Sequence, residues 1–279
     1  MTGNPPKKQN SLGTLLLNAP YIVWAAIFIV VPLVIVIYYA FTDKSGAFTF
    51  ENIKALAEYK DTFITSVWYS LIATAVTLVR AYPFAFFMSR AKVSSQRMMM
   101  MLVMLPMWMN LLIRTYSWMI ILERNGIINN LLGMIGVEPL KMIGTPGAVI
   151  LGMVYNYLPY MILPIYTVMS KIEPSLYEAA EDLGCGMWQK LRRVVLPLSL
   201  PGVISGITMV FVPSVSTFYI SYKLGGGKIN LIGDAIERQI QTSYNYNLGA
   251  SLSLVLMVFI LISLAIMNKF SGDEGGIVV

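Results

Sequence analysis

The sequence predicts an all-α, polytopic membrane protein with six transmembrane helices. Of its 279 residues, 57% are hydrophobic and 12% are charged, which leaves too little polar surface to cover a water-soluble globule of this length. Apolar runs recur along the chain, and each is long enough to cross a bilayer, which takes about 20 helical residues. We therefore expect residues 1–279 to form a single transmembrane domain surrounded by membrane lipid.

Charged and turn-forming segments separate the six predicted spans. The first span, about 12–41, is too long for the core of a signal peptide and should be retained in the mature protein. The remaining five form a core over about 63–268. Their expected ranges are about 63–88, 98–122, 146–170, 202–221 and 248–268.

Two stretches between the core spans are too interrupted or too polar to cross a membrane. Residues 127–144 are interrupted by Gly133, Gly136 and Pro139, which predict a short interfacial helix and a loop. Residues 222–247 are polar and predict a flexible loop. The run Gly225 to Lys228 is not a phosphate-binding loop, because Tyr222 and Ile229 occupy the positions that would need glycine and serine or threonine.

Prolines and two arginines interrupt the apolar spans. Five of the six spans carry proline, as the broken helices of transporters do, although proline is also common in membrane helices generally. Arg80 and Arg114 each cost about 2.5–3.5 kcal/mol near the bilayer centre and need compensation. For each arginine, snorkelling to the nearer headgroups is one interpretation. For Arg114, Asn110 one turn earlier also suggests a polar stripe that faces the bundle.

The segment from Ser175 to Pro197 predicts two short amphipathic helices joined at a bend, which we call the knob. Ser175 and Glu178 have the spacing of a capping box at the start of the first helix. Gly184 and Gly186 should end that helix, and Pro197 should end the second. Such a protruding pair of helices on a membrane protein predicts a surface for a partner.

The distribution of lysine and arginine predicts that both termini and the knob are cytoplasmic. This orientation places ten basic residues inside and eight outside, and Arg90, Lys92 and Arg97 lie close to the inner ends of two spans. The basic residues are spread among loops, so the formal charge of +6 does not indicate nucleic-acid binding. With no histidine and one cysteine, the common Cys/His metal sites are excluded.

The knob resembles the EAA loop of ABC-importer permeases. The match runs from Glu178-Ala179-Ala180 through Gly184 to Leu196-Pro197, and Val194 replaces the usual isoleucine. The rest of the chain looks like the first permease subunit of a spermidine/putrescine importer. The matching runs are Tyr82 to Ala85, Leu105 to Tyr116, Gly144 to Ile150, Tyr157 to Met161 and Asn230 to Gly233. Arg80 departs from this family, which usually has a small residue there.

The resemblance implies a MetI-like ABC importer permease fold and a non-catalytic subunit in the bacterial cytoplasmic membrane. It implies that this chain binds no cofactor and that ATP binds to an ATPase dimer below the membrane. The other implied partners are a second homologous permease and an extracellular polyamine-binding protein. It also implies a coupling loop over 171–198 whose ATPase-coupling residues are Glu178, Ala179, Ala180, Asp182, Gly184, Leu196 and Pro197.

A polyamine pathway needs π faces and acceptors, yet no carboxylate lies within the predicted apolar spans. We expect the wall to be mostly aromatic and amide. The candidate pathway residues are Trp108, Asn110, Arg114, Glu123, Tyr155, Tyr157 and Tyr219. The alternatives are an ABC permease for ferric ion, sulfate or an amino acid, a secondary transporter or channel, and a membrane-embedded enzyme. The knob disfavours a secondary transporter, and the lack of histidine and of clustered intramembrane carboxylates disfavours an enzyme.

Overall fold

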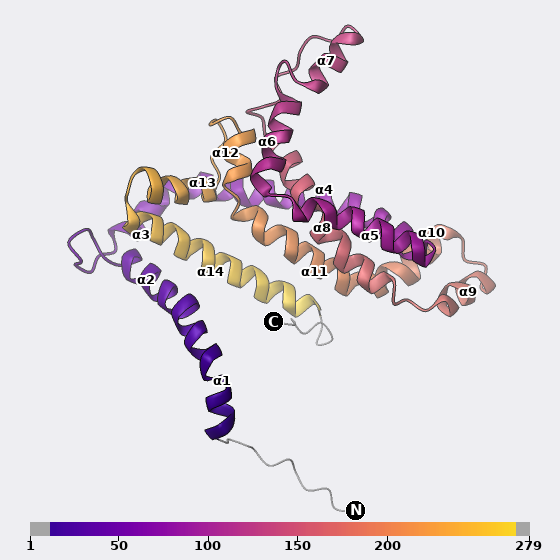
Figure 1. Ribbon diagram of the computed structural model, residues 1–279, viewed down its shortest axis with the longest axis horizontal. Coiled ribbons are helices and arrows are strands. Elements are labelled where there is room, and N and C mark those ends of the chain that lie inside the picture. Colours follow the sequence, from indigo (N-terminus) through magenta and orange to yellow (C-terminus); the bar gives the residue numbers. More distant parts are fainter. Residues whose placement is uncertain (1–11, 272–279) are drawn as a thin grey trace, which may run out of the picture.

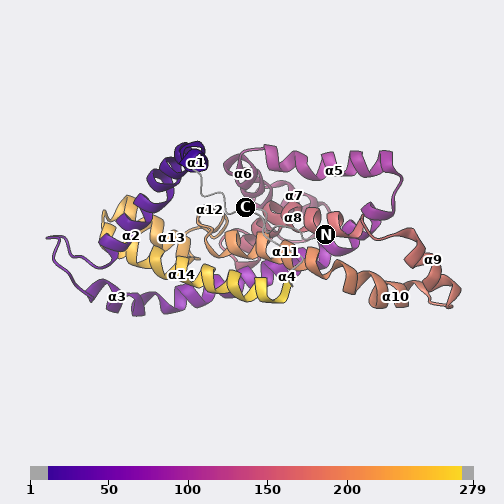
Figure 2. The same cartoon turned by 90° about the horizontal axis from the view of Figure 1, so that it is seen from below.

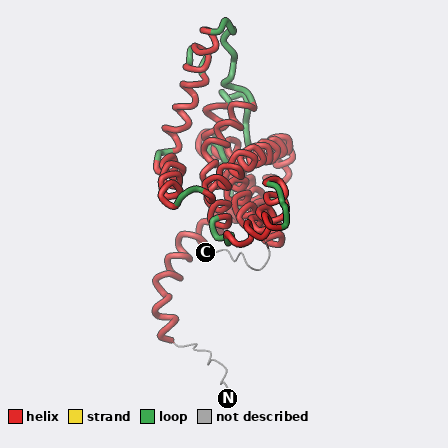
Figure 3. Tube along the Cα trace, turned by 90° about the vertical axis from the view of Figure 1, so that its right-hand side faces the viewer, coloured by secondary structure: helices red, strands yellow, loops and turns green. Residues whose placement is uncertain are grey.

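Helices make up most of the chain. The computed structural model describes residues 12–271. Within this range the trace shows helices and loops and no strand (Figure 3), with one isolated bridge between Thr42 and Phe48. The all-α prediction is therefore confirmed. The two ends of the chain, whose cytoplasmic position the sequence predicts, lie outside the described residues.

Long apolar helices run parallel to the longest axis of the molecule (Figure 1). They include α4 (Lys60–Arg90), α8 (Pro146–Met169), α11 (Leu196–Val215) and α14 (Tyr246–Ser271). Five helical stretches are long and apolar enough to cross a membrane, and a bent pair makes a sixth if it counts as one span. This arrangement confirms a polytopic membrane protein.

The first predicted span is a helical arm that leaves the bundle (Figures 1 and 3). It consists of α1 (Leu12–Ala25), the π-helical turn η1 (Ala26–Val30) and α2 (Val31–Ala40). The arm packs against the core through α2, on α14. The Asn247 amide of α14 secures the end of the arm by donating to the Thr42 carbonyl at 2.6 Å. From residue 18 to 39 no residue is buried, so this apolar arm suits a lipid environment.

Two glycines allow α8 and α11 to pack closely. Gly202 and Gly206 of α11 face α8, and a Cβ atom at Gly202 would lie 2.8 Å from the Pro164 carbonyl oxygen. At Gly206 a Cβ would lie 2.7 Å from the Met161 sulfur. Membrane helices associate through such close packing of small residues, because lipid is as apolar as the side chains themselves. The two glycines therefore set the separation of α8 and α11.

Four hydroxyl groups on α4 are buried, and each of them donates a hydrogen bond. Ser66, Ser70, Thr74 and Thr77 each donate to the carbonyl four residues earlier, at 2.6–2.7 Å. The Ser66 oxygen also accepts from the Ile232 amide at 2.7 Å and so ties α4 to α13 (Ile232–Glu237). Such self-contained bonding is what a low-dielectric interior requires.

The third predicted span, about 98–122, is bent and not one continuous helix. Helix α5 (Val93–Trp108) ends at Trp108. The stretch formed by α6 (Leu111–Leu122) and α7 (Ile127–Met134) then continues at an angle of 92° to α5 (Figure 1). Extended backbone at Met109 and Asn110 separates the helices, and the Asn110 side chain accepts from the Leu112 amide at 2.7 Å to start α6. Asn110, which the sequence suggested as part of a polar stripe within the membrane, is therefore a helix cap. The short interfacial helix after it is present as α7.

The fifth span begins earlier than predicted. Pro197 does not end the second helix of the knob. Instead, α10 (Met187–Lys190), the π-helical turn η3 (Leu191–Val195) and α11 continue as one stretch from Met187 to Val215. Proline removes the bond to the carbonyl four residues earlier, here that of Arg193 inside η3, and the wider π turn accommodates the loss. The same holds for Pro32 in the arm: the carbonyl that loses its bond belongs to Phe28, four residues earlier, and Phe28 lies in the π-helical turn η1.

Most of the predicted loop over 222–247 is folded. It contains the end of α12 (Tyr219–Leu224), then α13 and the π-helical turn η4 (Arg238–Thr242). Leu231 to Ala235 are buried. Burial raises the pKa of Asp234 to about 6, while its carboxylate accepts from the Leu231 amide at 2.8 Å. This carboxylate is engaged as the cap of α13.

Replacing Gly202 with alanine should destabilise the protein, because the added Cβ meets the backbone of α8 and forces the helices apart. We expect a loss of about 1–3 kcal/mol, the usual cost of overpacking, measured by thermal unfolding in detergent. Gly147→Ala in α8 is the matched control, since its Cβ would meet only the Thr145 hydroxyl at 3.9 Å. Equal stability of both variants would contradict the close contact.

Candidate functional site

The knob protrudes from one end of the bundle (Figures 1 and 2). Helix α9 (Pro174–Asp182) is followed by a turn and then by α10. Gly184 has a φ of +73°, its amide donates to the Glu181 carbonyl at 2.8 Å, and the Cys185 amide donates to the Ala180 carbonyl at 2.9 Å. These are the two bonds of a Schellman motif, which uses glycine in the left-handed region to end a helix. The predicted helix, turn and helix are present.

The predicted capping box at the start of α9 is absent. The helix begins at Pro174, Glu173 is the N-cap residue, and no side chain caps the first turn. The Ser175 hydroxyl instead donates to the Glu173 carboxylate at 3.3 Å. Proline at the first helical position needs no amide acceptor and has a preset φ, so it starts the helix without the box.

The predicted coupling residues do not share one environment. Ala180 is 6% exposed and faces the bundle. Glu178, Ala179, Asp182 and Gly184 are exposed and lie on the two-helix knob. Leu196 and Pro197 are exposed as well, but they lie at the start of α11. The exposed residues of this set thus lie on α9 with its turn and at the start of α11, and the structure leaves the coupling role of all seven residues a prediction.

Aromatic and charged side chains that the sequence analysis did not single out anchor the knob to the bundle. The Arg90 guanidinium at the end of α4 lies 3.8 Å from the ring centroid of Tyr177, which is 5% exposed in α9. A cation–π contact of this kind contributes about 0.5–2 kcal/mol. Arg90 and Tyr177 are far apart in sequence, so no local pattern could have linked them.

One further contact lies within the knob, and another joins α8 to α5. The Lys190 ammonium of α10 pairs with the Glu181 carboxylate of α9 across the turn, and this hydrogen bond lowers the pKa of Glu181. The Tyr166 hydroxyl of α8 donates to the Gln96 side chain at 3.0 Å, and the Gln96 amide donates to the Ala91 carbonyl at 2.9 Å. Exposed ion pairs contribute little stability, so the Lys190 pair mainly orients the two helices.

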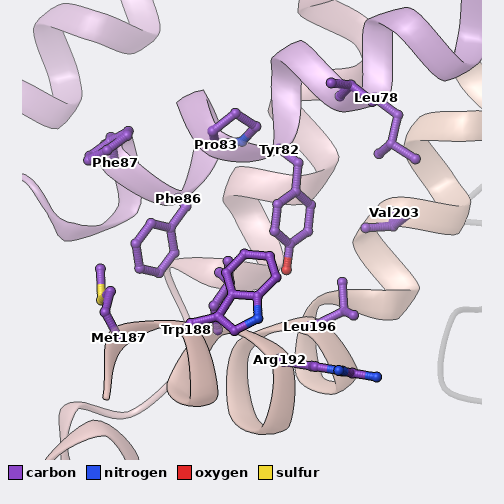
Figure 4. Close-up of a pocket in the computed structure, with 12 residues that line it drawn as sticks. Leu78, Tyr82, Pro83, Phe86, Phe87, Met187, Trp188, Arg192, Leu196 and Val203 are labelled. Atoms are coloured by element: carbon purple, nitrogen blue, oxygen red, sulfur yellow. The ribbon is translucent and has the colours of Figure 1, made fainter.

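An apolar pocket of about 840 Å³ lies between α4 and the α10–η3–α11 helix (Figure 4). Tyr82, Phe86 and Trp188 point into it, and Arg192 contributes the charged group to its lining. The Tyr82 hydroxyl lies 3.0 Å from the Ser199 hydroxyl, which links α4 to α11. With an arginine and no carboxylate among its lining residues, this pocket does not fit a polycation.

The candidate pathway aromatics occupy several sites. Trp108 is 75% exposed at the end of α5. Tyr155 packs against Trp118 with ring centroids 5.3 Å apart. Tyr157 donates to the Pro213 carbonyl in the last turn of α11 at 3.3 Å, and so satisfies a helix-end acceptor. Tyr219 begins α12 near Lys223.

The predicted polar stripe of Asn110 and Arg114 is wrong. Asn110 is exposed and caps α6, whereas Arg114 is 7% exposed inside the protein. Within residues 12–271, the Nε and Nη1 atoms of Arg114 have no hydrogen-bond partner. Glu123 is exposed at the C-terminal cap of α6. The structure therefore separates these three polar candidates.

Comparisons with known proteins place this arrangement in a family. The family described as "binding-protein-dependent transport system inner membrane component" matches residues 81–271, which include the knob and the helices α5, α8, α11 and α14. The chain belongs to this family. It is thus an inner-membrane component of a binding-protein-dependent transport system.

Individual relatives align with most of this chain. The spermidine/putrescine transport system permease protein PotB of Haemophilus influenzae is 37% identical over 238 residues, 81% of this chain and 82% of that protein. PotB of Escherichia coli is 35% identical over 236 residues, which are 81% of this chain and 86% of that protein. A bacterial ABC transporter that imports alginate shares the fold, with a TM-score of 0.76, 20% identity and coverage of 93% and 94%.

Gly184→Val should impair the knob of this transport subunit, because a β-branched residue in the left-handed region costs about 1–2 kcal/mol or more. We expect weaker co-purification with the ATPase and lower uptake. Gly186→Val is the matched control: Gly186 has a φ of −67°, and a Cβ at either glycine meets nothing within 4 Å. Wild-type coupling of the Gly184 variant would contradict the role of this turn.

Proposed function

We propose that the chain is the permease subunit of an ATP-driven importer for the polyamines spermidine and putrescine. The observation that carries the proposal is its 35–37% identity to two PotB permeases over 81% of its length. In this proposal it frames half of the pathway, and a second homologous permease frames the other half. A polyamine-binding protein delivers the cargo from outside.

ATP chemistry belongs to separate subunits in this proposal. An ATPase dimer would bind ATP and contact the exposed surface of the knob through Glu178, Ala179 and Asp182. The orientation of the chain then follows, with the knob and both termini in the cytoplasm. Because α10, η3 and α11 form one helical stretch, displacement of the knob would move the fifth span directly.

The charges of the spans limit how this chain handles a polycation. Arg80 is exposed on α4, and Arg114 is buried in α6. A cation in the pathway wall would repel the cargo, so neither arginine is a polyamine ligand in our proposal. Aromatic faces provide weak cation binding that suits transit, and any deep counter-charge would come from the second permease.

A specific observation favours a second candidate, an importer for an anion such as sulfate. The buried Arg114 has guanidinium nitrogens without acceptors in the described chain, and an anion would supply them. The alternative acceptor is a group from the second permease. The identity of the relatives makes the polyamine the stronger proposal.

The cargo can be identified by the ATPase activity of the complex, reconstituted in lipid nanodiscs with its own binding protein. We expect spermidine or putrescine to stimulate hydrolysis several-fold, while sulfate and ferric ion leave it at the basal level. Stimulation by sulfate alone would remove the polyamine and select the anion importer. An uptake assay that proceeds without ATP would instead support a secondary transporter.

A further inference from the structure

A cluster of tyrosines surrounds one lysine where α6 meets α12. The Lys223 ammonium lies 4.8 Å from the ring centroid of Tyr116, 5.8 Å from that of Tyr219 and 5.1 Å from that of Tyr222. It also donates to the Tyr116 hydroxyl at 3.1 Å. Tyr116 belongs to α6, and the other two tyrosines belong to α12. We call these three tyrosines the cage.

The cage has the chemistry of an alkylammonium site. Three π faces within about 6 Å of one cation, together with a phenol oxygen, resemble the aromatic cages that recognise ammonium ligands. The hydrogen bond that Lys223 donates to the Tyr116 hydroxyl raises the pKa of Lys223, so its side chain stays cationic. Within the described residues, no carboxylate forms a salt bridge with Lys223. The ammonium is held by aromatic groups alone.

The side chain in the cage is chemically close to the proposed cargo. A lysine side chain is a four-carbon chain that ends in a primary ammonium, and putrescine is a four-carbon chain with a primary ammonium at each end. A site that accepts one accepts the end of the other. Tyr116 and Tyr222 are 42% and 60% exposed, so the cage is accessible to a second ammonium from outside the chain.

We propose that the cage is a binding subsite for a primary ammonium group of the cargo, and that Lys223 is a tethered occupant which the cargo displaces. This inference rests on the proposed polyamine function. A tethered group acts at an effective concentration in the millimolar range. Free polyamine at lower concentration therefore leaves Lys223 in place, whereas cargo released by a docked binding protein arrives at a high local concentration and displaces it.

Displacement also distinguishes kinds of amine. A polyamine that loses one ammonium contact keeps its other ammonium for a second aromatic group, whereas a monoamine competes with Lys223 through a single contact. The tether thus reduces the affinity for any single-ended amine. If only one tenth of the cages are free of Lys223, the apparent dissociation constant of a ligand rises tenfold.

Equilibrium binding of radiolabelled spermidine to the complete transporter in nanodiscs, without binding protein, tests this inference. Lys223→Met keeps the aliphatic chain and removes the ammonium, so we expect the apparent dissociation constant to fall about tenfold. Tyr116→Leu should raise it, and the double variant should behave like Tyr116→Leu. Lys228→Met is the matched control for charge, because Lys228 lies in the turn after α12 and makes no cation–π contact with these tyrosines.

If Lys223 is a displaceable occupant, Lys223→Met and Tyr116→Leu change the apparent dissociation constant in opposite directions. A purely structural contact predicts changes in the same direction. If Lys223 only fastens α12 to α6, both single variants loosen the same contact and both weaken spermidine binding. That result, or an unchanged affinity in Lys223→Met, would overturn the inference. Failure of the polyamine function itself is a separate outcome, since the wild-type complex with its binding protein would then show no ATPase stimulation by spermidine.

Discussion

The close crossing of α8 and α11 is the contact on which the rest of the structure depends. At Gly202 the backbone of α11 lies against the backbone of α8 at Pro164 and Ile165, next to the Val168 side chain. Helix α4 packs against both helices, and its Tyr82 hydroxyl lies beside that of Ser199. Since α11 is continuous with the second half of the knob, this crossing also connects the proposed partner surface to the membrane core.

The knob itself is attached at two kinds of site. Its second half is covalently continuous with α11 through a π turn, and its first half is held by the Arg90–Tyr177 contact at the end of α4. Two attachments to different spans make the knob a rigid extension of the bundle. This rigidity is what a subunit needs if it is to transmit the motion of an ATPase into the membrane.

The apolar lengths in the sequence predict the spans formed by α4 and α8 closely. Helix α8 spans Pro146–Met169 against a predicted 146–170, and α4 spans Lys60–Arg90 against 63–88. The knob was also predictable, because Gly184 and the amphipathic stripes are local signals. The resemblance that the knob suggested agrees with the family and with its relatives.

Features that depend on remote contacts or on local backbone geometry were not predictable. Pro197 was expected to end a helix because sequence rules do not reveal that a π turn can absorb a proline. The bend before α6 depends on the extended backbone at Met109 and Asn110. The cage joins Tyr116 to residues about a hundred positions later, which only the packing of α6 on α12 reveals.

The distance between Gln189 in α10 and Met209 in α11 tests most directly whether the knob and the fifth span move as one body. Both side chains are exposed, and spin labels there, in a Cys185→Ser background, should lie about 30 Å apart along one helix. We expect double electron–electron resonance to give the same narrow distribution in the nucleotide-free and ATP-trapped transporter. A label pair between residue 189 and the second permease should shift, showing that the knob has moved. A change of several ångströms between residues 189 and 209 would contradict this picture and place a hinge at the π turn.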